Sequence, residues 1–166
     1  MTPRDRSHLA RDLGFAVVAT LALAATALIG QAATYPNLTP WYAGLSKPPF
    51  NPPNWVFAPA WTTLYLLMAL ALWRILCRPP ATPGRTAALI ACAAVLVLNA
   101  AWSWMFFGAH SPLLGLVDIG PQLVVILATI RLFHRLDRFA GWCLVPLAAW
   151  VAFAGVLNLA IWWLNG

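Results

Sequence analysis

The sequence predicts an all-α integral membrane protein, built as a bundle of five transmembrane helices in a single domain of residues 1–166. Hydrophobic residues make up 62% of the chain and charged residues only 8%, whereas a soluble domain carries about 25% charged residues. The mean hydropathy is +0.77. The apolar residues also gather in five long runs, and about 20 residues in a helix are enough to cross the hydrocarbon core of a bilayer.

The five spans follow one another with mostly short connections. We expect them at residues 13–33, 55–77, 86–107, 113–133 and 140–164. A polar, basic arm, residues 1–12, precedes the first span. Pro121 should kink the fourth span, because proline removes a hydrogen bond from the interior of a helix.

A proline-rich segment, residues 34–54, joins the first two spans. Its two Pro-Pro pairs restrict the backbone at and before each proline, so the segment should be a stiff, ordered loop. It is also aromatic, and aromatic side chains need apolar surface to cover. We therefore expect a lid folded over the interior of the bundle, with aromatic residues Trp41, Tyr42, Phe50 and Trp55.

The basic residues predict the orientation. Nine arginines fall in polar segments on one side of the membrane, and Lys47 alone falls on the other. By the positive-inside rule, the N-terminus lies in the cytoplasm and the lid and the C-terminus lie outside, in a bacterial inner membrane. Topology thus explains the formal net charge of +6, so we expect membrane lipid, and no nucleic acid, as a partner.

Few titratable residues could carry chemistry. Cys77, Cys92 and Cys143 lack the spacing of a metal site, so we expect small core residues and no metal centre. Asp118 is the one acidic residue within a span, which makes it a functional candidate, although near the outer end of its helix it could also reach water or a neighbouring amide. His110, near the lid, could be an axial haem ligand or an ordinary surface histidine.

Three spans each carry an aromatic face at helical spacing. Such faces could converge on a pocket for a large, flat, apolar ligand, which asparagine side chains would orient. The same pattern also fits ordinary packing between helices, with interfacial tryptophans and asparagines bonded to backbone. The three faces are Trp61, Tyr65 and Met68; Asn99, Trp102 and Phe106; and Trp150, Ala154, Leu157, Asn158 and Ile161.

Small residues on the third span predict a homodimer. Ala87 with Ala91, and Ala88 with Cys92, form two small-xxx-small pairs, which allow two helix backbones to approach closely.

These motifs together resemble those of a known family. The stretch WYAGLSKPPFNPPNWVFAPAWTTLYLLMALALWR resembles the signature first loop and second helix of the TspO/MBR family, which comprises the tryptophan-rich sensory proteins, the translocator proteins and the peripheral-type benzodiazepine receptor. The segments LNAAWSWMFFG and PLAAWVAFAGVLNLAIWWLN are similar to the third and fifth helices of that family. The resemblance covers nearly the whole chain.

The resemblance implies a five-helix bundle, often dimeric, with a pocket closed by the first loop. That pocket would bind porphyrins such as protoporphyrin IX or haem as ligands, with no cofactor required, as well as synthetic isoquinolines and benzodiazepines. Carried over by motif position, the ligand-binding candidates are Trp41, Trp55, Trp61, Tyr65, Asn99, Trp102, Phe106, Trp150, Phe153, Ala154 and Asn158.

The resemblance leaves three functions open. The first is a receptor or sensor for tetrapyrroles. The second is an enzyme-like, light-dependent breakdown of porphyrin, for which Trp61 and Trp150 would be the catalytic residues. The third is transport of porphyrin or another lipophile, although five spans without an internal repeat do not favour alternating access. Sterol binding is not expected, because the C-terminal tail lacks the tyrosine and arginine of the animal motif.

Overall fold

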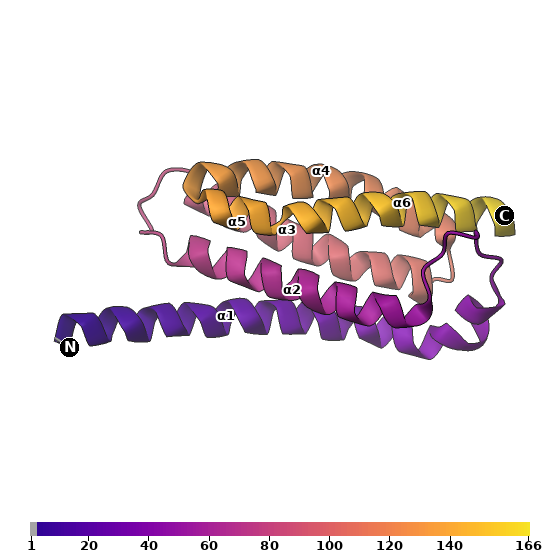
Figure 1. The fold of residues 1–166 in the computed structure, drawn as a ribbon, viewed down its shortest axis with the longest axis horizontal. Helices are drawn as coiled ribbons and strands as arrows, with labels where there is room; N and C mark the ends of the chain where they lie inside the picture. Colours follow the sequence, from indigo (N-terminus) through magenta and orange to yellow (C-terminus); the bar gives the residue numbers. More distant parts are fainter. Residues whose placement is uncertain (1–2) are drawn as a thin grey trace.

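The computed structural model describes residues 3–166, and they form a helical bundle (Figure 1). Five segments are long and apolar enough to cross a membrane: 8–42, 54–76, 85–108, 112–136 and 138–165. This confirms the all-α membrane class for the described residues. The helices are α1 (Pro3–Thr34), α2 (Asn54–Leu76), α3 (Arg85–Ser103), α4 (Pro112–Leu136), α5 (Arg138–Cys143) and α6 (Val145–Asn165).

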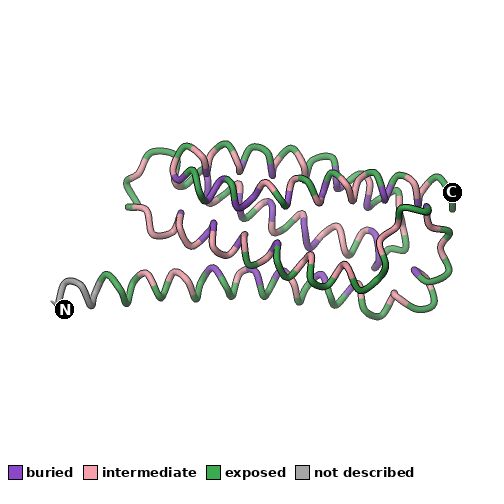
Figure 2. Tube along the Cα trace, viewed as in Figure 1, coloured by how far each residue is buried: buried purple, intermediate pink, exposed green. Residues whose placement is uncertain are grey.

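Packing is centred on α3 and α4. α4 lies against both α3 and α6, while α1 lies against α2 and α3 (Figure 1). Along the helices, buried positions lie mainly on the sides that face the bundle interior, and exposed positions lie on the outer sides (Figure 2). Large apolar side chains such as Leu21, Leu66 and Val124 are exposed on that outside, where lipid would cover them. The main core includes Met68 and Phe133.

The first helix is longer than expected. α1 begins at Pro3, so the basic segment forms the first turns of the same helix instead of a separate arm. No glycine or internal proline interrupts residues 4–12, and proline is well tolerated in the first turn of a helix. Its 32 residues span about 48 Å, more than the hydrocarbon core of about 30 Å. The N-terminal end of α1 accordingly projects beyond the other helices (Figure 1).

The segment expected as a loop, residues 34–54, is in fact helical in its first part. A 3-10 turn (Tyr35–Asn37) follows α1 directly, the chain then kinks at Thr39, whose backbone is extended, and a short helical turn runs through Tyr42 to Gly44. Extended backbone and turns follow, with both Pro-Pro pairs in them, and α2 begins at Asn54 directly after Pro53. We call residues 43–53 the lid.

Two other expectations need correction. The last span is broken at Leu144 into α5 and α6, because Pro146 in the first turn of α6 has no N–H to continue the helix from α5. Pro121, by contrast, lies inside α4 without ending it.

On α3, Ala88 and Cys92 are buried within the bundle and pack there, so this pair is not available to a second copy.

Candidate functional site

A cavity of about 920 Å³ lies at the lid end of the bundle, within the range of small-molecule sites. Every spanning segment contributes to its wall. Nine of the eleven candidates from the sequence line it. Helical spacing explains why the candidates of each helix lie on the same face of that helix. The nine are Trp61, Tyr65, Asn99, Trp102, Phe106, Trp150, Phe153, Ala154 and Asn158.

Aromatic rings from α2 and α6 form one wall of the cavity. The ring of Trp150 stands edge-on to two rings of α2, with centroids 6.4 Å from Trp61 and 5.9 Å from Phe57. Tyr65 lies beside Trp61 at 5.6 Å, and Phe153 lies beside Trp150 at 5.9 Å. These are favourable aromatic geometries, and they present flat apolar surface to the interior.

A second aromatic group comes from the end of α3 and from the π-helical turn Trp104–Gly108 that follows it. Trp102 and Phe106 are stacked, with centroids 5.0 Å apart and an interplanar angle of 16°. Phe107 packs edge-on against both of them. These rings belong to a satellite core at the lid end, which also contains Tyr42, Leu157 and Ile161.

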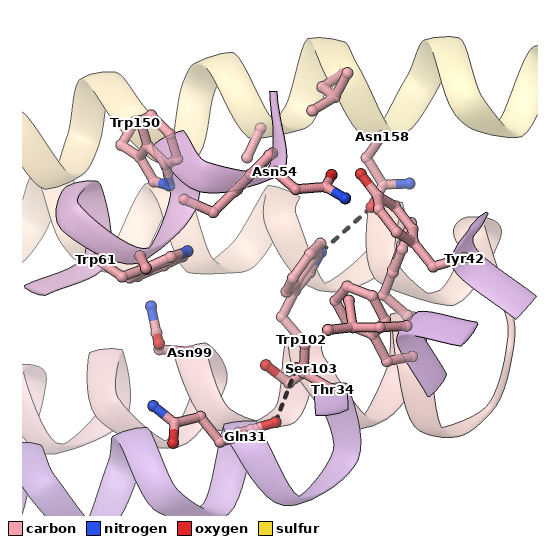
Figure 3. Close-up of a pocket in the computed structure, with 18 of the residues that line it drawn as sticks. Gln31, Thr34, Tyr42, Asn54, Trp61, Asn99, Trp102, Ser103, Trp150 and Asn158 are labelled. Atoms are coloured by element: carbon pink, nitrogen blue, oxygen red, sulfur yellow. Dashed lines mark hydrogen bonds between the residues drawn. The ribbon is translucent and has the colours of Figure 1, made fainter. Parts of the chain in front are cut away.

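The two asparagines on the aromatic faces have different hydrogen-bonding roles. The Tyr65 hydroxyl donates to Asn99 Oδ1 at 2.8 Å, which orients this amide, while Asn99 Nδ2 is buried and has no partner among the described residues. In Figure 3 this nitrogen points toward the space beside Trp61. A buried donor without an acceptor is costly, so an acceptor on a ligand would satisfy it.

Asn158, in contrast, is bonded on both sides. Its Oδ1 accepts from Trp102 Nε1 at 3.3 Å (Figure 3). Its Nδ2 donates to the carbonyl of Pro112 at 2.6 Å. The side chain therefore ties α6 to the start of α4. Gly115 makes this approach possible, because a Cβ there would lie 2.7 Å from Asn158 Oδ1 and 3.0 Å from Phe106.

Trp41 closes the lid end without lining the cavity. Its ring packs edge-on against Phe106 at 5.4 Å and stacks on His110 at 4.7 Å. His110 Nε2 lies 2.6 Å from Asn37 Oδ1, and His110 is likewise outside the cavity wall. His110 thus fastens the segment between α1 and the lid, instead of presenting a ring nitrogen to a ligand in the cavity.

Trp55 is not part of the cavity wall. It is 74% exposed and lies on the outside of the first turn of α2. Asn54, Phe57, Ala58 and Trp61 line the cavity at the spacing of one helix face, and position 55 falls off that face.

Asp118 is more enclosed than its position in the sequence suggested. It is only 3% exposed, does not line the cavity, and its Oδ2 has no partner among the described residues. It therefore reaches neither bulk water nor a neighbouring amide through that oxygen.

Several wall residues were missed from the sequence. Polar groups reach the cavity from Gln31 and Thr34 of α1 and from Ser103 of α3 (Figure 3). Lys47 of the lid and Gln122 of α4 also line it. Gln31 and Thr34 are spaced i and i+3, so they lie on one face of the helix. Two polar residues on one face near the end of an apolar span could have indicated, from the sequence, that this face lines a cavity.

Comparison with known proteins agrees with this architecture. The model of the TspO/MBR family matches residues 16–164. The tryptophan-rich protein TspO of Archaeoglobus fulgidus is 39% identical over 150 residues, covering 90% of this chain and 95% of its own. The tryptophan-rich protein TspO of Chlorobaculum tepidum is 41% identical over 125 residues, covering 75% and 79%. The human translocator protein is 34% identical over 146 residues, covering 86% and 85%.

Proposed function

This chain belongs to the TspO/MBR family of integral membrane proteins, and from that premise we propose that it is a membrane receptor or sensor that binds tetrapyrroles, such as protoporphyrin IX or haem, in the cavity beneath the lid. The observation that carries the proposal is the combination of flat aromatic walls with one unsatisfied donor, Asn99 Nδ2. A porphyrin has a large apolar face and carboxylate acceptors at its edge, so it matches both features.

Titration of the purified protein with protoporphyrin IX tests this proposal. Quenching of tryptophan fluorescence should saturate at a fixed stoichiometry. Ala154→Leu, which places a larger side chain in the cavity wall, should weaken binding at least ten-fold. The control is Ala152→Leu, the same exchange on an exposed position of α6, which should leave the affinity unchanged. Equal affinities for the two variants would remove the cavity as the site.

The close pair of Trp61 and Trp150 supports a second candidate function. Both oxidisable indoles face the cavity, 6.4 Å apart. Illuminated porphyrin with dioxygen could be degraded there, with the two tryptophans as reaction partners. Loss of porphyrin absorbance should then require light and air and should slow in Trp61→Phe and Trp150→Phe. The same product in dark or anaerobic samples would exclude photo-oxidation.

We further propose that the chain lies in a bacterial inner membrane with its N-terminus in the cytoplasm, because its arginines gather at one end of the bundle. Alkaline phosphatase, which is active outside the cytoplasm, should be active when fused to the C-terminus and inactive when fused to the N-terminus.

We also propose a homodimer that uses the exposed Ala87 of α3. Ala87→Leu should produce a monomer by light scattering in detergent, and a persistent dimer would place the interface elsewhere.

A further inference from the structure

A compact charged cluster lies at the end of the bundle opposite the lid. Asp137, between α4 and α5, accepts hydrogen bonds at Oδ2 from Arg74 Nε and from Arg78 Nη2, both at 2.9 Å. Its Oδ1 caps α5 by accepting from the Ala140 N–H at 3.0 Å. The cluster therefore joins the end of α2 and the α2–α3 turn to the start of α5.

The cluster carries more positive charge than this structural role requires. Burial raises the pKa of Asp137, but the hydrogen bonds from Arg74, the Ala140 N–H and Arg78 together lower the pKa to about 2. One ionised carboxylate thus faces two guanidinium groups at neutral pH. The Arg74 and Arg78 side chains remain 37% and 42% exposed, while Asp137 is almost fully buried.

Each guanidinium retains unused donors. Arg78 contacts Asp137 through Nη2, and Arg74 through Nε and Nη2, so most of the N–H groups of Arg78 and about half of those of Arg74 have no partner among the described residues. A guanidinium offers five N–H donors in a planar fork that matches a phosphate. The exposed part of the cluster is therefore a set of phosphate donors with a net positive charge.

An apolar surface continues directly from this cluster. The Arg74 guanidinium lies over the ring of Phe139, 5.1 Å from its centroid, and Phe139 is 54% exposed. Trp142, three residues further along α5 and on the same side of that helix, is 63% exposed. Positive charge beside exposed aromatic surface at the end of a span is the environment of a phospholipid at the membrane interface.

We propose that Arg74 and Arg78 bind the phosphate of an anionic phospholipid whose acyl region lies along Phe139 and Trp142. Charge complementarity favours an anionic lipid over a zwitterionic one, because a choline group would cancel the charge that the cluster attracts. The site lies at the other end of the bundle from the cavity and does not depend on what the cavity binds.

Native mass spectrometry of the full chain in detergent, with phosphatidylglycerol or phosphatidylcholine added, tests the site. The wild type should retain phosphatidylglycerol preferentially. Arg78→Gln keeps the Arg74–Asp137 pair and should weaken that lipid about five-fold, the equivalent of about 1 kcal/mol for one basic residue near a membrane surface. Phe139→Ala should also weaken it. Arg131→Gln removes a charge from an exposed position of α4 and should have little effect.

Asp137→Asn separates a lipid site from a purely structural ion pair. Asparagine still caps α5, but it frees both guanidinium groups, so the protein should become less stable while phosphatidylglycerol binds as tightly or more tightly. A parallel loss of stability and lipid binding in this variant would overturn the proposal. Equal losses in Arg78→Gln and Arg131→Gln, or full displacement of the lipid by an equal concentration of inorganic phosphate, would also overturn it.

Discussion

Ser46 and Asn165 hold each other through two reciprocal hydrogen bonds, which join the lid to the last residue of α6. The Ser46 N–H donates to Asn165 Oδ1 at 2.9 Å, and Asn165 Nδ2 donates to the Ser46 carbonyl at 2.9 Å. Next to this pair, Lys47 Nζ donates to the carbonyls of Tyr42 at 2.6 Å and Leu45 at 3.1 Å, which holds the start of the lid. The lid is thus fixed at a defined point above the cavity.

We predict that Asn165→Ala opens the lid more often. Loss of two exposed hydrogen bonds, each worth at most about 1 kcal/mol net of competition with water, should speed porphyrin release three- to ten-fold. Stopped-flow measurement of release would detect this change. Ser46→Ala is the matched control, because both bonds use the Ser46 backbone. A similar acceleration in that variant would show that the Ser46–Asn165 pair does not hold the lid.

The two cavity asparagines should respond differently to the same exchange. Asn99→Leu removes an unsatisfied donor, which offsets the loss of the acceptor for the Tyr65 hydroxyl, so it should weaken porphyrin binding several-fold and change the melting temperature little. Asn158→Leu breaks the link to the Pro112 carbonyl and should lower thermal stability, at a cost of about 1–3 kcal/mol. Paired porphyrin titrations and thermal melts in one detergent would separate them. A larger stability loss in Asn99→Leu would reverse this assignment.

Gly115 should tolerate no side chain. In Gly115→Ala the new Cβ would meet Asn158 Oδ1 at 2.7 Å and Phe106 at 3.0 Å, and both neighbours are buried. Such overpacking costs about 1–3 kcal/mol. On the same helix, Gly120→Ala would meet nothing within 4 Å and should be neutral or slightly stabilising. Thermal unfolding of the two variants checks the contrast, and equal stability would mean that α4 and α6 can separate at no cost.

The stability of the charged cluster should depend on acid pH. The pKa of Asp137 is lowered in the folded state to about 2, from an ordinary value near 3.8. The carboxylate therefore stabilises the fold above about pH 4, and this contribution is lost as the pH falls from 4 toward 2. At neutral pH we expect about 1–2 kcal/mol, because the partly exposed arginines are screened by solvent.

Comparison of the wild type with Asp137→Asn isolates this residue from the other acids. Their difference in unfolding free energy should be largest near neutral pH and should shrink between pH 4 and 2. A difference that stays constant across this range would show that the carboxylate charge is not the source of the stability.

Much of the site could be predicted from the sequence, because the signals are local. Helical spacing placed Trp61 and Tyr65, Asn99 and Trp102, and Trp150 and Ala154 on single faces, and the structure brings these faces to one cavity. The same spacing, applied to Asn54, Phe57 and Trp61, would have excluded Trp55, but Trp55 was assigned by motif position and not by its place on a helix face.

The sequence by itself determined the number of spans, because hydropathy and length decide what can cross a bilayer, and it determined the faces that the helices turn inward. Only the tertiary structure decided what each polar group on those faces does. Asn99 and Asn158 occupy equivalent positions in their patterns, yet one retains a free donor and the other is bonded to α4. Hydrogen bonds between helices depend on which backbones approach closely, as at Gly115, and that proximity is a property of the assembled bundle.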